Sequence, residues 1–171
     1  MAATSADLRA KWLRKSGGEL RRGHVKIYLD ACCLNRLTDD QDQQRIAEEA
    51  EAVEQTLRLL RTNTIEWLSS TALEAETSNN PDPERRREVQ VLLLLATNTI
   101  PLDGQIIERA KRLEAVGYGA FDALHLSSAE AGEANVLLTT DDRFMKRAAR
   151  GVGSPRVRVV NPVEWLREQE G

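Results

Sequence analysis

Apolar positions along the chain follow two different spacings. Short runs of consecutive apolar residues, as long as a β-strand, are separated by longer stretches in which apolar residues recur every three or four positions. The run Val25–Leu29 is β-prone and stops at Asp30, so it predicts the first strand. The helical spacing is clearest in the next apolar series, which comprises Ile46, Ala50, Val53, Leu57 and Leu60. This series predicts one long amphipathic helix with a single apolar face.

The rest of the chain repeats this alternation. We expect further strands at residues 64–68, 98–102, 135–139 and 157–160. We expect helices from Ser69 or Ser70 to Asn79, at residues 84–96, from an Asp103 cap to Gly117, and at residues 121–131 and 142–150. Within the helix at residues 84–96, the run 91–95 is apolar on most faces, which predicts that this helix is well buried.

The order of these elements predicts the fold class. Apolar strands alternate with helices, and no hairpin turn dipeptide lies between them, which indicates right-handed crossovers between parallel strands. Helices cover such a sheet on both faces. We therefore predict an α/β protein, a three-layer α/β/α sandwich with a mostly parallel central sheet. Active sites in such folds lie outside the carboxyl ends of the strands.

Composition is typical of one domain. The 171 residues are 41% hydrophobic, which is enough for one sizeable core. No apolar run approaches the roughly 20 residues that cross a bilayer, and no export signal is recognisable, so we expect a cytoplasmic protein. The only cysteines, Cys32 and Cys33, are adjacent, and this spacing favours two small apolar core residues over a disulfide or a zinc site.

Acidic residues lie at predicted strand ends and helix starts, which is where active sites occur in this fold class. Asp30 ends the first strand, Asp122 opens the helix after the Gly-Tyr-Gly loop, and Asp141 follows the fourth strand. Glu74 or Glu76, in the helix after the second strand, would be a fourth acid. Two carboxylates about 4 to 5 Å apart repel by roughly 3 to 4 kcal/mol at an effective dielectric constant near 20, so a cation has to compensate. Oxygen ligands with open water positions favour Mg²⁺ or Mn²⁺.

Each acid alone has a structural explanation, because aspartate is a common helix cap and turn former. Their joint arrangement is more specific. Four motifs occur in order over residues 26–144, namely Tyr28-Leu29-Asp30, Ser70-Thr71-Ala72-Leu73-Glu74-Ala75-Glu76, Phe121-Asp122-Ala123-Leu124-His125 and Leu138-Thr139-Thr140-Asp141-Asp142-Arg143-Phe144. Together they resemble the motif set of the PIN-domain nucleases, which include the VapC-type toxin ribonucleases.

The resemblance implies a Mg²⁺- or Mn²⁺-dependent endoribonuclease, often the toxin of a bacterial type II toxin-antitoxin system. RNA would then be the substrate, a small antitoxin protein a partner, and a homodimer is also plausible. Asp30, Asp122 and Asp141 match the family's metal-binding acids. The glutamate that would orient the attacking water or accept its proton is better matched by Glu76, six residues after the serine, but Glu74 stays possible. On a helix these two glutamates point about 200° apart, so only one can face the metal.

Five other residues have both a functional and a structural interpretation. Thr139 resembles a hydroxyl residue that orients the last acid. Asn35 resembles a polar residue that lines the pocket, and an ordinary loop residue explains it equally well. Asp142 is an accessory ligand or a helix cap, with the cap slightly favoured, and Arg143 contacts a phosphate or belongs to a solvated helix face. His125 lies among apolar neighbours, so we interpret it as a packed histidine and not as a catalytic one.

The net charge of residues 1–24 is opposite in sign to that of the rest of the chain. Residues 1–24 carry six basic and two acidic side chains, a net charge of +4, and the whole chain carries −3, so residues 25–171 carry −7. We interpret residues 1–24 as a basic N-terminal extension and residues 25–171 as the nuclease domain. The extension is a disordered tail, an arm that contacts RNA or a segment ahead of the biological start. Overall charge favours neither the presence nor the absence of a polyanionic partner.

Two other classes of function fit parts of the pattern. A PIN-fold module without catalysis would regulate by binding RNA or protein, and the presence of all the expected acids argues against it. A phosphoacceptor domain of the response-regulator type requires paired acids and a strand-end lysine, and the sequence shows neither in the required places. It also has no glycine-rich phosphate loop, so nucleotide hydrolysis and redox chemistry have no support.

Overall fold

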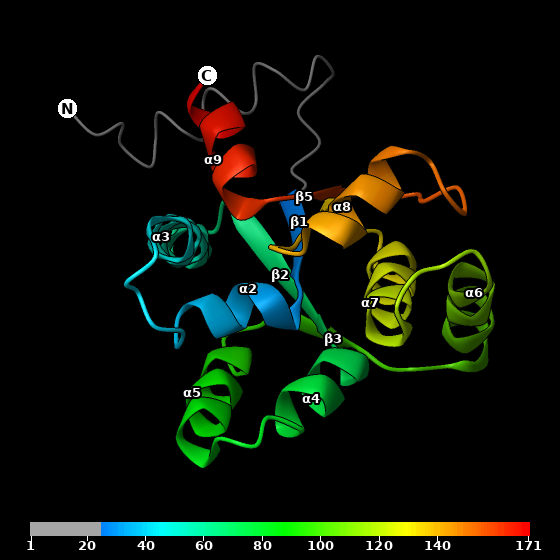
Figure 1. The fold of residues 1–171 in the computed structure, drawn as a ribbon, viewed down its shortest axis with the longest axis horizontal. Helices are drawn as coiled ribbons and strands as arrows, with labels where there is room; N and C mark the ends of the chain where they lie inside the picture. Colours follow the sequence, from blue (N-terminus) through cyan, green and yellow to red (C-terminus); the bar gives the residue numbers. More distant parts are fainter. Residues whose placement is uncertain (1–24) are drawn as a thin grey trace.

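A five-stranded sheet forms the centre of the computed structural model, which describes residues 25–171 (Figure 1). The strands are β1 (Val25–Leu29), β2 (Ile65–Ser70), β3 (Asn98–Ile100), β4 (Val136–Leu138) and β5 (Arg158–Val160). Their order in the sheet is β3-β2-β1-β4-β5, and each neighbouring pair is parallel. The sequence thus predicted all five strands. The extension proposed at residues 1–24 lies outside the described residues.

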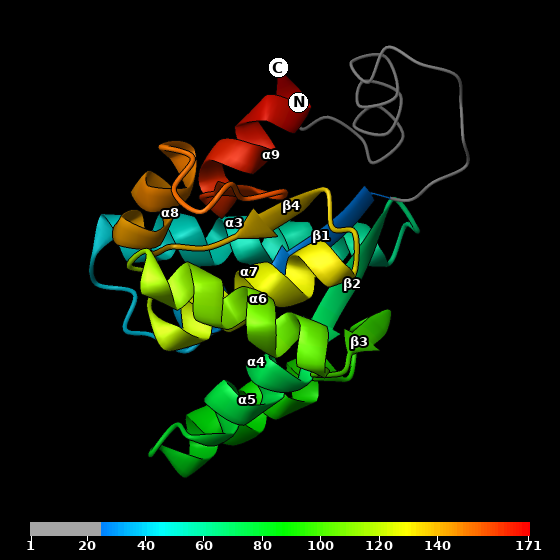
Figure 2. The ribbon, with the colours of Figure 1, turned by 90° about the vertical axis from the view of Figure 1, so that its right-hand side faces the viewer.

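Helices cover both faces of the sheet. They are α2 (Ala31–Arg36), α3 (Gln44–Leu60), α4 (Thr71–Ser78), α5 (Pro83–Leu93), α6 (Gly104–Ala115), α7 (Ala120–Ala131), α8 (Asp142–Ala149) and α9 (Pro162–Glu170). Figures 1 and 2 show α3 on one side of the sheet and α6 and α7 on the other, which confirms the predicted three-layer sandwich. Among residues 25–171, no helix is both long and apolar enough to cross a membrane.

The pleat of the strands divides the core into two clusters. Ile27 and Leu29 belong to one cluster, together with Val53 of α3 and Trp165 of α9. Tyr28, between them in sequence, belongs to the other cluster with residues of α6 and α7. Successive side chains of a strand point to opposite faces, and here both faces are covered. This double burial explains why β1 is a continuous apolar run without polar alternation.

The order of the strands brings the carboxyl ends of β1 and β4 together. The chain runs from β1 outward through β2 to β3, and then returns to pair β4 with the other side of β1. The backbone amide of Asp30 donates to the Leu138 carbonyl oxygen (3.2 Å), so the residues that follow the two strands are neighbours. A switch point of this kind leaves a crevice at the carboxyl ends, where ligands bind in parallel α/β sheets.

Helix α5 is not the well-buried helix that the sequence predicted for residues 84–96. It ends at Leu93, and Val89 is the buried residue within it. Val91, Leu94 and Leu95 are 58%, 82% and 56% exposed. The prediction was wrong because an apolar run shows only that a segment could be buried on every side. In the structure, α5 packs against α2 and α4 with one side only.

The hydrophobic pattern did not predict α2 and α9. Helix α2 has six residues, too few to show a helical period, and its first turn is capped by the Asp30 carboxylate, which accepts from the Cys33 amide (3.0 Å). Helix α9 starts at Pro162 after the Asn161 cap, a combination that favours a helix start. Cys32 and Cys33 are free thiols in α2. Cys33 is fully buried, as expected, whereas Cys32 is only half-buried and not a core residue.

The exposure of α5 gives a paired stability prediction. Replacing Leu94 with alanine should change the free energy of unfolding by less than about 0.5 kcal/mol, because this side chain buries little surface. Replacing Leu113 of α6, which is fully buried, should cost about 2 to 5 kcal/mol. Denaturant unfolding of both variants measures the difference, and equal losses would contradict the exposure of α5.

Candidate active site

Asp30 is a buried carboxylate at the end of β1. It is 1% exposed, its Oδ1 accepts from the Cys33 amide (3.0 Å), and its Oδ2 is buried without a hydrogen-bond partner among the described residues. Burial raises the pKa of Asp30 to about 6, although the charge of His125, the nearby Thr139 hydroxyl and the hydrogen bond from the Cys33 amide lower it. An oxygen that is both buried and unpartnered is costly unless something cationic or protic faces it.

Asp122 and Asp141 lie close enough to Asp30 for the three charges to interact. Asp122 is in the first turn of α7, and Asp141 caps α8, where its Oδ1 accepts from the amides of Arg143 (2.8 Å) and Phe144 (3.1 Å). Burial, followed by the charges of Asp30 and Asp141, raises the pKa of Asp122 to about 7. The fold therefore gathers the three aspartates that the sequence had placed at strand and helix ends.

These carboxylates suit a hard divalent cation. The unpartnered Asp30 oxygen and the mutual repulsion of the three aspartates are both relieved by positive charge, and the donor atoms are oxygens, which Mg²⁺ and Mn²⁺ prefer. Within residues 25–171, no group of three or more histidine, cysteine, aspartate or glutamate side chains is arranged to hold a metal ion by itself. Mg²⁺ usually keeps several of its waters and binds through one or two carboxylates.

The two candidate glutamates of α4 point in different directions. Glu76 is half-buried and its Oε2 lies 2.5 Å from His125 Nε2. Its charge contributes to the raised pKa of both Asp30 and Asp122. Glu74 is exposed, and the main causes of the raised pKa of the two aspartates include Glu76 and not Glu74. The structure thus separates the two positions, as the helical geometry required.

His125 is the residue of the site whose surroundings the sequence did not reveal. It is 1% exposed, which agrees with a packed histidine, but both of its ring nitrogens have polar partners. Nδ1 lies 2.8 Å from the Tyr28 hydroxyl, and Nε2 contacts Glu76. The prediction of a packed histidine is therefore confirmed, but it considered only residues adjacent in sequence and did not reveal these polar partners. The spacing of three between Asp122 and His125 was the available signal.

Two residues of the segment after β4 have structural partners. Thr139 is buried, and its hydroxyl accepts from the Asp141 amide (3.1 Å), so it contacts the backbone of the last acid. Asp142 accepts two hydrogen bonds from Arg45 of α3 (2.9 and 2.8 Å), which also donates to the Thr140 carbonyl (3.2 Å). Asp142 is not the cap of α8, as the sequence favoured, because Asp141 takes that position.

The other two accessory candidates lie on helices. Asn35 belongs to α2 and is not a loop residue, and its backbone carbonyl accepts from the amides of Thr38 and Asp39. Arg143 is exposed in the first turn of α8, directly after the Asp141 cap. Its position leaves the guanidinium at the surface beside the acidic site.

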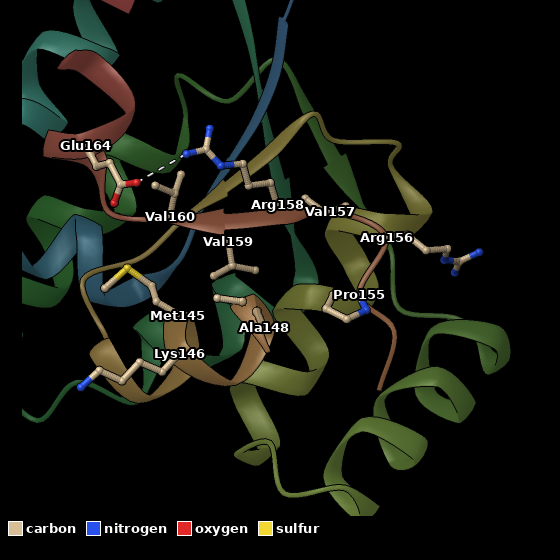
Figure 3. A pocket seen from close by; sticks show the side chains of 11 residues that line it. Met145, Lys146, Ala148, Pro155, Arg156, Val157, Arg158, Val159, Val160 and Glu164 are labelled. Atoms are coloured by element: carbon tan, nitrogen blue, oxygen red, sulfur yellow. Dashed lines mark ion pairs between the residues drawn. The ribbon is translucent and has the colours of Figure 1, made fainter. Parts of the chain in front are cut away.

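A cavity of about 590 Å³ lies apart from the acidic residues, between α8, β5 and the start of α9 (Figure 3). Met145, Lys146, Val159 and Glu164 are among its lining residues, and an ion pair joins Arg158 to Glu164 (3.6 Å). None of the aspartates or glutamates of the acidic site lines this cavity. This cavity is therefore separate from the acidic site.

Comparison with known proteins gives a family and a fold. The PIN domain family matches residues 27–150, a stretch that contains Asp30, Glu76, Asp122 and Asp141. No curated protein matches the chain. Among solved structures, the chain resembles VapBC2 from Rickettsia felis bound to a DNA fragment from its promoter, with 17% sequence identity and a TM-score of 0.56 over 80% of this chain and 98% of that chain. At this identity the likeness shows the fold alone.

The raised pKa of Asp30 predicts how stability depends on pH in the presence of a chelator. The fold favours the neutral carboxyl, so the contribution of Asp30 to stability is present below pH about 4 and is lost as pH rises through about 6. Asp30→Asn does not titrate. Between pH 4 and pH 8, the wild type should therefore lose about 2 to 3 kcal/mol more than this variant. Denaturant unfolding of both proteins at each pH measures the difference. Parallel pH profiles would show that Asp30 ionises freely.

Proposed function

The chain belongs to the PIN domain family, whose members are generally nucleases, and on that premise we propose that it is a Mg²⁺- or Mn²⁺-dependent endoribonuclease. The observation that carries this proposal is the convergence of Asp30, Asp122 and Asp141 with a buried, unpartnered oxygen among them. Perturbed carboxylates gathered in one place are typical of functional sites. RNA is the substrate class that the sequence resemblance implies.

Asp30, Asp122 and Asp141 would hold the metal ion in this mechanism. When bound, a divalent ion supplies a Lewis acid that neutralises phosphate charge and makes water more acidic. The chain orients two of these ligands before any ion arrives, because the Asp30 and Asp141 carboxylates are fixed by backbone amides at the starts of α2 and α8. Preorganised ligands avoid the cost of ordering side chains during binding.

Glu76 would act on the attacking water. Its carboxylate accepts the proton as the water oxygen attacks phosphorus and the bond to the leaving oxygen breaks. Arg143, exposed beside the Asp141 cap, would contact a phosphate of the RNA backbone, and Asn35 of α2 would line the pocket. Asp142 takes no direct part, because Arg45 already occupies both of its oxygens.

We further propose that the protein is the toxin of a type II toxin-antitoxin system and binds a small antitoxin protein. The fold is shared with VapBC2, and Val91, Leu94 and Leu95 form an apolar surface that the rest of residues 25–171 leaves exposed. Exposed apolar groups of this size are typical of protein interfaces. The cytoplasm is the compartment in which such a protein would reach its RNA.

Removing a metal ligand should abolish cleavage without unfolding the protein. We expect wild type to cut a pool of structured RNAs with Mg²⁺ or Mn²⁺ and not with EDTA, and Asp30→Asn to be at least about 100-fold slower, since a metal supplies several kcal/mol of transition-state stabilisation. Asp40→Asn, an identical change at an exposed aspartate, is the matched control. Undiminished cleavage by Asp30→Asn would refute the assignment. A folded wild type that cleaves none of the RNAs with either metal would instead indicate a silent binding module.

The two glutamates of α4 provide a second pair of variants. Glu76→Gln should lower kcat by about 100-fold or more with little change in KM, because the side chain keeps its shape but loses its basicity. Glu74→Gln should stay within about twofold of wild type, because Glu74 is exposed and on a helix points about 200° away from Glu76. Single-turnover cleavage of one RNA substrate measures both. A larger loss for Glu74→Gln would reverse the assignment of the two residues.

A further inference from the structure

A chain of four buried or half-buried polar side chains crosses the core beneath the acidic site. Ser70 Oγ lies 2.6 Å from the Tyr28 hydroxyl, which lies 2.8 Å from His125 Nδ1. His125 Nε2 lies 2.5 Å from Glu76 Oε2. Ser70, Tyr28 and His125 are at most 1% exposed, so water cannot replace a hydrogen bond that is lost here.

The chemistry of these groups fixes the direction of the last hydrogen bond. An ionised carboxylate only accepts, so Nε2 of His125 carries the hydrogen and donates it to Glu76. If the imidazole is neutral, Nδ1 accepts from Tyr28, which in turn accepts from Ser70. If the imidazole is charged, Nδ1 donates and the two hydroxyl hydrogens reverse. The donation to Glu76 is the same in both cases, so it does not depend on the charge of the ring.

The same four residues connect the elements that carry the acids. Tyr28 lies on β1 two residues before Asp30, and His125 lies on α7 one turn after Asp122. Ser70 ends β2 and caps α4, where its Oγ also accepts from the Leu73 amide (3.0 Å). The ring of His125 is fixed from both sides, because it stacks on Phe121 (6.1 Å between centroids, 24° between planes) and contacts Tyr28 (5.6 Å).

We propose that His125 is a positioning residue for the nuclease reaction: held by Tyr28 and Ser70, it fixes the Glu76 carboxylate in the direction of Asp30 and Asp122. This inference rests on the proposed function, in which Glu76 acts on the attacking water. Glu76 sits in the second turn of a short helix and its side chain is 29% exposed, so without the Nε2 donor it would sample several rotamers. A misplacement of about 1 Å in a reacting group can slow an enzyme by about 100-fold.

Two variants separate positioning from packing. The amide of His125→Gln reaches the place of Nε2 and can still donate to Glu76, whereas the shorter His125→Asn reaches only the place of Nδ1. We expect His125→Asn to lower kcat about 10- to 100-fold at unchanged KM, and His125→Gln to recover a large part of the loss. Equal losses in the two variants would overturn the proposal, because only His125→Gln keeps a donor at the place of Nε2.

A double-mutant cycle tests whether His125 acts through Glu76. In the Glu76→Gln background, His125→Asn should reduce kcat by less than about threefold, because the carboxylate that it positions is already gone. If His125→Asn costs the same factor in both backgrounds, then His125 acts independently of Glu76 and the proposal fails.

Nuclear magnetic resonance of the imidazole tests the contact without cleavage and without a substitution in the core. Wild type, metal-free, should show a slowly exchanging, low-field Nε2–H resonance of His125, and Glu76→Ala should move it upfield or broaden it away. A His125 Nε2–H resonance that is the same in both proteins would overturn the proposal. If wild type does not cleave RNA, the nuclease function fails, but this measurement still decides whether His125 holds Glu76.

Discussion

Burial of the Asp30 carboxylate at the end of β1 is the constraint on which the site depends. β1 lies between β2 and β4, so its carboxyl end is enclosed by the ends of its neighbours and by the helices that follow them. One oxygen has a backbone partner and the other has none among the described residues. Asp122 and Asp141 add negative charge at the same place. The fold thus brings together carboxylates whose burial and mutual repulsion are unfavourable, and a bound cation would relieve both.

Other buried acids of the chain show that this cost is not general. Burial alone would raise the pKa of Glu49, but hydrogen bonds from Arg45, Arg36 and Asn161 hold it below its usual value. The same holds for Glu130, where the guanidinium of Arg109 and the backbone and side chain of Arg156 outweigh burial and keep the pKa low. Where the chain buries a carboxylate for stability, it supplies partners. In the acidic site, Oδ2 of Asp30 has no such partner among residues 25–171, which supports a role in binding or catalysis.

The helix caps of the site have a structural and a functional role at once. Asp30 caps α2, Asp141 caps α8, and Ser70 caps α4 while it contacts Tyr28. A cap accepts hydrogen bonds from backbone amides of the first turn, and these bonds fix the orientation of its side chain relative to the helix. The two interpretations of these residues are therefore compatible, because the hydrogen bonds that start α2 and α8 also hold the carboxyl groups of Asp30 and Asp141 in place.

The sequence by itself determined the five strands, the parallel sandwich and the aspartates at its carboxyl edge, because apolar periods and strand-end residues are local properties. Only the tertiary structure decided the rest. In the structure, the apolar side chains at the end of α5 are exposed and Asp142 pairs with Arg45. Glu76 is half-buried whereas Glu74 is exposed, and His125 contacts Tyr28, which is 97 residues away. Each of these outcomes depends on which elements pack against each other, and a contact between distant segments leaves no periodic trace in either segment.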